Sequence, residues 1–271
     1  MNLVCENKAT LLLKSVALGC DVELEKKLLH PVVSGTDVNR FCPLPERQYI
    51  LFPYRVVNGV VRLISIEEMQ QEYPKTAEYL QTNRKTLENR EKGKFRDQEW
   101  HRFGRNQNLG IQENVKLCVP RLVERLYATI DHEGRYYLDN VDVGGVTLKP
   151  GYENHSLYYL LGLLNSSVLR WFFPFVSAPF RGGWLSANRQ FLSLLPACLI
   201  DFSIKSEKAH HDRMVRLVAQ MLALHQQLRN AITGHDQTLI QRQIDATDRQ
   251  IDRLVYELYG LSEEEIAVVE G

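Results

Sequence analysis

The chain has 271 residues, no formal net charge and 44% hydrophobic residues, an ordinary composition for one large folded domain or one domain with an appendage. It has no apolar run long enough for a transmembrane helix and no basic-then-apolar N-terminus typical of a signal peptide, so we expect a cytoplasmic protein without a membrane partner. Its five cysteines lie far apart, which argues against a disulfide framework or a zinc ribbon.

Charge is distributed unevenly along this neutral chain. Residues 84–125 contain eleven Lys or Arg and six Asp or Glu, whereas residues 236–271 contain three Arg and nine acidic residues. Such a distribution can present a positive face to a polyanion. The alternative is that these charged segments are simply solvated.

The first third of the chain is predicted to mix strands and helices. The runs 49–57 and 60–65 are rich in β-forming residues. Asn58-Gly59 lies between them, and this dipeptide favours the type I′ turn of a hairpin.

Helices are predicted after this hairpin. Ser65 and Glu68 have the spacing of a capping box, which indicates a helix start. Pro74 suits the first turn of a second helix, expected to run to about Arg90. A short helix is expected over 97–104, because Asp at its start and Gly at its end are typical cap residues.

Strands return in the middle of the chain. We expect them at 115–119, 125–130 and 135–139. Residues 156–173 are apolar on nearly all sides of a helix, which predicts one long buried helix. A short strand is expected at 197–200.

The pattern changes from about Ser206 onward. Apolar residues then follow alternating steps of three and four, which is typical of a coiled-coil seam. They are Met214, Leu217, Met221, Leu224, Leu228 and Ala231, and then Ile240, Ile244, Thr247, Ile251, Leu254 and Leu258. Gly234 is expected to end the first helix and Asp236 to cap the second. Ser262 and Glu265 form a capping box for a last short helix.

These elements predict an α/β fold of the α+β kind. We expect a twisted mixed sheet with packed helices, followed by a C-terminal antiparallel helical hairpin. The expected domains are residues 1–205, an α/β domain that lacks its start, and residues 206–271, the hairpin with its short terminal helix.

Motifs for chemistry are missing from the sequence. It contains neither of the usual glycine-rich phosphate loops, and it has no hydrolase G-x-S-x-G and no H-E-x-x-H. Asp21, Glu25 and Lys27 crudely resemble a nuclease motif, but the two carboxylates are spaced too tightly. We therefore expect no catalysis by this chain alone.

Three ordered stretches resemble one family. "LEKKLLHPVVSGTDVNRF" is similar to the E-x-x-L-L-x-P-x-x-x-G-x-D-(I/V)-x-R-(F/Y) motif near the start of TaqI-like target-recognition domains. "EWHRFGRNQNLGIQENVKLCVP" is similar to the family's W-(Y/H)-x-x-x-R-x-Q, followed by a lysine-containing strand that ends in Pro. "YYLLGLLNSSVLRWFF" and "RGGWLSANRQFLSLLP" resemble its L-L-G-L-L-N-S helix, glycine-rich loop and terminal L-P. The resemblance extends over roughly residues 25–266.

The resemblance implies a module that reads duplex DNA beside a DNA adenine methyltransferase domain, often within a restriction–modification enzyme with a fused endonuclease. It implies that S-adenosylmethionine is bound by the methyltransferase domain, in the same or a separate chain, and that this chain itself holds no cofactor and no metal. The chain departs from the family in lacking that neighbouring domain. We therefore interpret it as a fragment or a natural truncation.

The loop after residue 180 is the first candidate site that the resemblance implies. It lies in the segment 170–196, which combines arginines and aromatic rings without acidic residues. Arg reads guanine and Asn reads adenine in the major groove. Backbone amides at a glycine pair can approach phosphate closely. The candidates are Arg181, Gly182, Gly183, Trp184, Asn188 and Arg189. The alternative is that arginines here snorkel at the edge of a core. We expect the Phe residues of the whole segment 170–196 to be core residues.

The basic middle region is the second candidate site. Arg105 and Gln107 match the family pattern, as does Trp100, which we expect in the core. Further candidates are Arg84, Lys92, Lys94, Arg102 and Asn106, of which Arg84 and the lysines suit phosphates better than bases. Arg40 and Asp37 are expected to have structural roles, paired at a turn.

Two other functions remain as alternatives. The first is a protein–protein scaffold, in which the helical hairpin binds another chain or a second copy in a homo-oligomer. The second is a small-molecule enzyme with His101, Asp142 or His155 as acid–base residues, although no constellation of such residues converges in the sequence.

Overall fold

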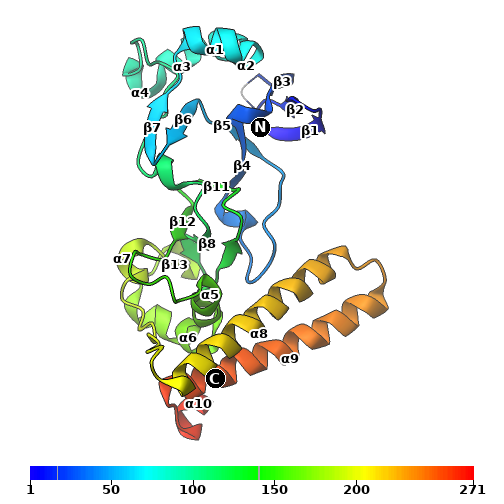
Figure 1. Cartoon of the computed structure of the whole chain (residues 1–271), viewed down its shortest axis with the longest axis vertical. Coiled ribbons are helices and arrows are strands. Elements are labelled where there is room, and N and C mark those ends of the chain that lie inside the picture. Colours follow the sequence, from blue (N-terminus) through cyan, green and yellow to red (C-terminus); the bar gives the residue numbers. More distant parts are fainter. Residues whose placement is uncertain (17, 140) are drawn as a thin grey trace. The chain divides into compact units, whose positions relative to one another are not determined.

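The chain folds into two compact units, each described here by itself. The computed structural model describes residues 1–16, 18–139 and 141–271. Unit 1 comprises Met1–Val32, Glu46–Asn114 and Glu133–Tyr137, and unit 2 comprises Val33–Pro45, Val115–His132 and Leu138–Gly271 (Figure 1). The helical hairpin belongs to unit 2, so residue 205 marks the start of an element rather than a border between these units.

Unit 1 begins with an antiparallel meander of β1 (Asn2–Glu6), β2 (Thr10–Lys14) and β3 (Asp21–Glu25). Helix α2 (Pro74–Thr82) packs against β3. The Glu25 carboxylate accepts hydrogen bonds from the backbone N–H groups of Lys75 and Thr76, at 2.9 and 2.8 Å. A carboxylate at a helix N-terminus stabilises the unpaired amides there, which gives Glu25 a structural role.

The predicted hairpin is confirmed in part. Strands β6 (Tyr54–Val57) and β7 (Val60–Leu63) pair antiparallel, and Asn58 and Gly59 take φ of 51° and 76°, as a type I′ turn requires. The first half of the run behaves differently, because Pro53 interrupts it. Strand β5 (Tyr49–Leu51) pairs with β4 (Leu29–Val33), in a sheet completed by β11 (Tyr137–Leu138).

The helices of unit 1 are shorter than predicted. Helix α1 (Ile66–Glu72) starts at the expected capping box. The helix expected up to Arg90 breaks at Asn83, where α2 ends, and continues as α3 (Arg84–Glu88) and α4 (Arg90–Gly93). Residues 97–104 form only turns, which corrects the predicted helix. The carbonyls of Trp100 and Arg102 both accept from Arg90 Nη2 at 2.9 Å, so they are directed at that guanidinium instead of along a helix.

Unit 2 contains a three-stranded antiparallel sheet in the order β10-β8-β12 and a two-stranded ribbon. The sheet consists of β8 (Lys116–Pro120), β10 (Thr129–Asp131) and β12 (Val143–Val146), and the ribbon pairs β9 (Leu122–Val123) with β13 (Leu185–Ser186). No strand was expected at β12, where two glycines hide the pattern. Residues 197–200 are not a strand.

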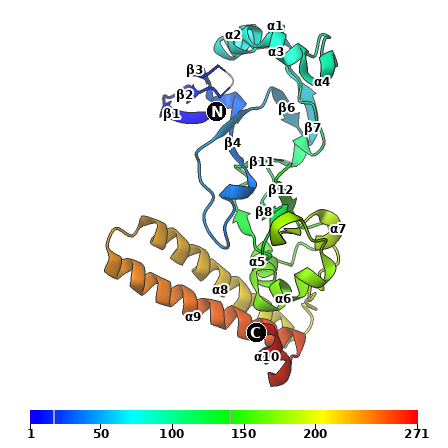
Figure 2. The ribbon, with the colours of Figure 1, turned by 180° about the vertical axis from the view of Figure 1, so that it is seen from behind.

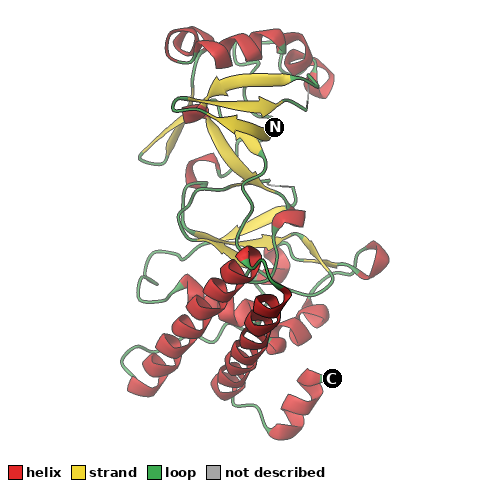
Figure 3. Ribbon diagram, turned by 90° about the vertical axis from the view of Figure 1, so that its right-hand side faces the viewer, coloured by secondary structure: helices red, strands yellow, loops and turns green. Residues whose placement is uncertain are grey.

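The α/β class is confirmed, but the single twisted mixed sheet is not. The described strands form five small sheets, and every pairing with a described register is antiparallel (Figure 3). Strands of two to five residues, several of them next to or containing proline, are too short to build one wide sheet.

The predicted long buried helix is two helices. Helix α5 (Leu157–Asn165) and helix α6 (Ser167–Val176) meet at a bend of 71°. Ser166 caps α6 through its Oγ, which accepts from the N–H of Leu169. The buried Asn165 side chain exchanges two hydrogen bonds with the backbone of Ala128, at 2.8 and 3.0 Å. In the described part of the chain no single helix is long and apolar enough to cross a membrane, and only this bent pair, taken together, passes that test.

The C-terminal hairpin is confirmed. Helices α8 (Lys205–Asn230) and α9 (Gly234–Tyr259) run antiparallel, and the short helix α10 (Glu263–Glu270) starts at the expected capping box (Figures 1 and 2). The caps between the long helices differ from the prediction. Helix α8 already ends at Asn230, and Thr233 caps α9 by accepting from the N–H of Asp236 at 3.1 Å.

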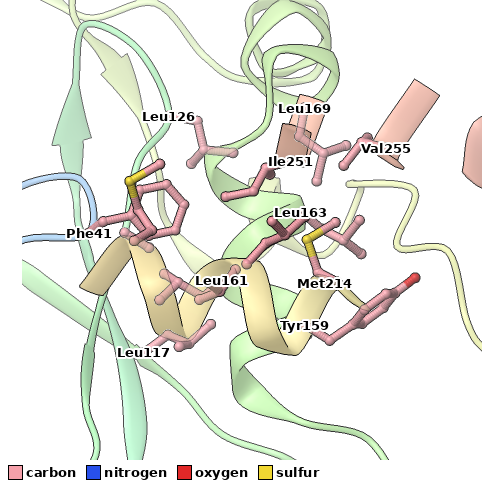
Figure 4. Packing of buried hydrophobic residues seen from close by; sticks show 14 of the residues in the cluster. Phe41, Leu117, Leu126, Tyr159, Leu161, Leu163, Leu169, Met214, Ile251 and Val255 are labelled. Carbon is pink, nitrogen blue, oxygen red and sulfur yellow. The ribbon is translucent and has the colours of Figure 1, made fainter. Parts of the chain in front are cut away.

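The core of unit 2 lies between α5, α8, α9 and β8, and Figure 4 shows Leu161, Leu163, Met214, Ile251 and Val255 within it. Helices α5 and α8 approach closely because Gly162 has no side chain. A Cβ at Gly162 would lie 2.4 Å from Met214 Sδ. The seam residues therefore join the hairpin to the core of unit 2 instead of only to each other.

Candidate nucleic-acid interface

The predicted loop in unit 2 is a tight, exposed turn, here called the 180–189 loop. Arg181–Gly183 form a 3₁₀ turn in which Gly182 and Gly183 have φ of 77° and 85°. Residues other than glycine are strained in this left-handed conformation. The N–H of Phe180 donates to the carbonyl of Trp184 at 2.6 Å and closes the turn. The glycine pair is thus needed for the course of the backbone.

Cationic and aromatic side chains of this loop point to solvent. Arg181 and Arg189 are exposed, and neither side chain has an ion pair or hydrogen bond among the described residues. Phe180 and Trp184 are 57% and 39% exposed. The loop therefore presents unpaired guanidinium groups beside aromatic rings on one anchored turn.

Asn188 lies at the base of the loop, where both ends of its amide are engaged. Its Nδ2 donates to Ser186 Oγ at 2.7 Å, and its Oδ1 accepts from Arg121 Nη1 at 3.0 Å. The N–H of Ala187 donates to the carbonyl of Arg121 at 2.8 Å. Arg121 was not among the predicted residues, yet it holds the base of the loop. Asn188 would have to break these bonds to contact a base.

The expectation that the Phe residues of segment 170–196 are core residues is correct only in part. Phe173 is fully buried, but Phe175 and Phe180 are 70% and 57% exposed. Phe175 lies against Trp171, with ring centroids 5.0 Å apart, and Trp171 is itself 40% exposed. Helix α6 has one face toward the core, so rings at its other positions remain at the surface.

Three of the predicted residues in unit 1 already have acidic partners. Arg84 pairs with Glu88 at 2.7 Å, Lys94 with Glu91 at 3.3 Å and Arg102 with Asp97 at 2.6 Å. Exposed pairs of this kind are weak, so a polyanion can compete for these cations.

Other basic-region candidates are solvated. Lys92 is exposed at φ of 61°, and Arg105, Asn106 and Gln107 form an exposed stretch. The side chains of Lys92 and Arg105 have no partner among the residues that the structure describes. These two cations therefore suit phosphate contacts best within unit 1.

Buried aromatic residues hold this basic region together. Trp100 is 2% exposed, which confirms it as a core residue. The guanidinium of Arg84 lies 5.3 Å from its ring centroid. Phe95 lies between Arg90 and Arg102, at 4.3 and 4.8 Å. Such cation–π contacts are modestly favourable, and they hold the guanidinium groups over the rings.

The residues of the enzyme alternative are divided between the two units. His101 is buried in unit 1, where its Nε2 lies 2.8 Å from the carbonyl of Ile64, and burial lowers its pKa. Asp142 and His155 belong to unit 2, where Asp142 is exposed and His155 packs against Phe202. Among the described residues, no three His, Cys, Asp or Glu side chains gather as metal ligands do.

Comparison with known proteins identifies the family. The family model of the TaqI-like C-terminal specificity domain matches residues 30–197. The chain belongs to this family. This TaqI-like chain is also 26% identical, over 93% of its length, to the type II restriction enzyme and methyltransferase RM.Eco57I of Escherichia coli. It is 21% identical, over 92% of its length, to the type II methyltransferase M.BstVI of Geobacillus stearothermophilus.

The resemblance drawn from the three motifs is thereby confirmed. The specificity-domain match includes the 180–189 loop and the stretch Arg102–Gln107, whereas α8 and α9 lie outside it. The chain spans only 26% and 37% of the length of these two relatives.

Proposed function

We propose that this chain is the module that reads duplex DNA for a restriction–modification adenine methyltransferase. The family supports this proposal, and so do the names of both relatives. The observation that carries it furthest is the 180–189 loop, where exposed, unpaired arginines flank a glycine turn and a tryptophan.

Each group of side chains has a distinct role in this proposal. Arg181 and Arg189 each present a planar fork of donors that matches the O6 and N7 acceptors of guanine. The amides at Gly182 and Gly183 suit a phosphate, and Trp184 adds an apolar contact. Lys92 and Arg105 in unit 1 contribute phosphate contacts, which add affinity without sequence choice.

Catalysis is assigned to another part of the enzyme. We propose that the chain alone does no chemistry and that a methyltransferase domain, in the same or a separate chain, binds S-adenosylmethionine. An endonuclease can be fused to the same enzyme, as the name of the E. coli relative indicates for that protein. We place the complex in the cytoplasm. Any self-association is expected to use the turn of the helical hairpin, where Ile232 is 95% exposed.

The test uses the chain joined to its methyltransferase domain, with methylation measured on the correct site and on single-base variants. Arg181→Ala or Arg189→Ala should weaken the recognition of the correct site by about 1–3 kcal/mol, measured as a lower methylation rate. Each variant should also discriminate less well between bases at one position of the site. Lys92→Ala should weaken methylation of all sequences alike, because a phosphate contact carries no sequence information.

Two controls accompany this test. Arg249→Ala, at an exposed position of α9, should change neither rate nor discrimination. The chain without the methyltransferase domain should leave DNA unmodified and uncut with S-adenosylmethionine and magnesium. Equal losses on every sequence for both loop variants would show that the loop only holds the backbone. Methyl transfer by the chain alone would refute its non-catalytic role.

A further inference from the structure

A groove of about 470 Å³ lies in unit 2. Its walls come from the segment after β9, from α6 and from α10, which packs against α6. The lining side chains are Glu124, Arg125, Ser167, Arg170, Trp171, Pro174, Val269 and Glu270. None of the predicted site residues is among them.

Two arginines of this groove have no acidic partner. Arg125 is exposed and Arg170 is half-buried, and neither side chain makes a hydrogen bond or ion pair with a residue that the structure describes. Burial lowers the pKa of Arg170, and the neighbouring charges of Arg40 and Arg125 lower it further. A guanidinium with five donors is costly to desolvate without acceptors. An anion in the groove would supply them.

Nearby acceptors are already in use. Asp248 forms a bidentate ion pair with Arg40, at 2.5 and 2.8 Å. Asp252 accepts from the N–H and the hydroxyl of Ser167 at 2.8 and 2.7 Å. These carboxylates lower the local positive potential without forming a bond to Arg170.

The remaining walls indicate the size and charge of the ligand. The indole of Trp171, which is 40% exposed, offers a face for a planar ring. Glu124 and Glu270 are exposed and oppose negative charge. This opposition is stronger for a dianion such as inorganic phosphate than for a singly charged phosphodiester.

We propose that this groove binds the phosphate group of a nucleotide, with Arg125 and Arg170 as donors and the attached base or sugar against Trp171. The phosphate comes from a DNA backbone or from a small free phosphodiester such as a dinucleotide, because the singly charged diester is preferred. The DNA source rests on the proposed function, whereas the anion site does not.

The first arm titrates the chain with inorganic phosphate and with a dinucleotide that has one internal phosphodiester. Trp171 fluorescence reports binding in a Trp184→Phe background, since Trp100 is buried. Arg125→Gln and Arg170→Gln should each weaken dinucleotide binding about tenfold or more, as expected for a charged hydrogen bond. Glu124→Gln should strengthen it, and Arg249→Gln should leave it unchanged. Arg125 is exposed, so its variant remains informative if Arg170→Gln fails to fold.

The second arm measures the affinity for a labelled short duplex against salt concentration, with Trp184 intact. If the source is DNA, each groove variant should lower the log–log slope by about one. Weaker dinucleotide binding with unchanged duplex binding would support the groove as a site for a small free phosphodiester.

Unchanged dinucleotide binding together with an unchanged duplex slope in both arginine variants would overturn the proposal. The proposed function would still stand in that case if Arg181→Ala blurs base discrimination. Conversely, dinucleotide binding that depends on Arg125, in a chain that binds no duplex, would support the groove and count against the proposed function.

Discussion

Arg40 joins three segments of unit 2. Its guanidinium donates to both carboxylate oxygens of Asp248 on α9, and its Nε and Nη2 donate to the carbonyl of Asn165 at 3.1 and 2.6 Å. The guanidinium carbon also lies 5.0 Å from the ring centroid of Phe41. The two charged side chains are only 24% and 28% exposed, so water screens the pair less than it screens a surface pair.

Arg40→Ala should lower the free energy of unfolding by about 2–3 kcal/mol, because a partly buried carboxylate and a carbonyl lose their donor together. Urea unfolding measures this loss. Arg40→Lys should recover only part of it, since one ammonium cannot replace the planar fork. A double-mutant cycle with Asp248→Asn isolates the pair. These contacts of Arg40 with Asp248 and Asn165 are here called the Arg40 clamp. A loss below about 0.5 kcal/mol would mean that the Arg40 clamp is solvated.

The expected pairing of Arg40 with Asp37 was wrong, although both residues have structural roles. Asp37 accepts from the N–H of Ser34 at 2.9 Å and so caps its own turn. Arg40 reaches an acid 208 positions away. Sequence spacing predicts the short-range cap well. It gives no measure of a partner whose distance in space depends on how the helices pack.

Helix α5 packs close to α8 because Gly162 has no side chain. A Cβ there would also lie 3.0 Å from Met214 Cγ and 3.1 Å from Val218 Cγ2, and both of these α8 residues are fully buried. Ala is the better helix former by about 1 kcal/mol, but it would force the two helices apart.

Gly162→Ala should therefore destabilise the protein by about 1–3 kcal/mol, as overpacked core substitutions do. Thermal unfolding gives the sign and size. Gly234→Ala is the matched control, because a Cβ at the start of α9 meets nothing within 4 Å. Met214→Ala and Gly162→Ala together should cost less than the sum of the two single losses, because the shorter side chain leaves room for the added Cβ. Equal melting temperatures for the two glycine variants would rule out the close approach.

Elements with local signals were predictable, and their breaks were not. The Asn58-Gly59 turn and the capping boxes at Ser65 and Ser262 depend on neighbouring residues, and each was found in the expected place. The bend at Ser166 depends on Asn165 bonding to Ala128, which is 37 positions away. The apolar periodicity of the sequence alone predicts a continuous helix through this bend.

The same difference between local and distant contacts applies to the candidate sites. The 180–189 loop is contiguous, so its composition identifies it as a candidate, and its contact with DNA stays a prediction. The groove was missed because Arg125, Arg170 and Glu270 come from separate segments. Arg121 was missed for the same reason, since its contact with Asn188 spans 67 positions.

Over the whole molecule, buried histidines link stability to pH. Burial lowers the pKa of His30 and His101 in unit 1 and of His225 in unit 2, each from an ordinary value of 6.5. As the pH falls, these histidines therefore become protonated in the unfolded chain at a higher pH than in the folded protein. The contribution of the neutral, buried histidines to the free energy of unfolding is complete above pH 6.5. It is lost as the pH drops toward their lower pKa values in the folded protein.

The melting temperature should therefore be steady above neutrality and fall as the pH drops below 6.5. His30→Phe should reduce this fall, because the ring still packs against Tyr137 and Phe52 but no longer titrates. Calorimetry at several pH values checks both statements. A melting temperature independent of pH over this range would contradict the assignment of these histidines as buried neutral groups.

The clamp at Arg40 also sets an order of events during synthesis. Unit 1 is complete once Tyr137 has left the ribosome. Arg40, however, must wait for Asp248, and Phe41 must wait for His225, whose ring stacks near its own. At about 5–20 residues per second, the segment Val33–Pro45 stays without its final neighbours for on the order of ten seconds or longer. A nascent chain arrested before α9 should thus contain a folded unit 1 and a protease-sensitive remainder.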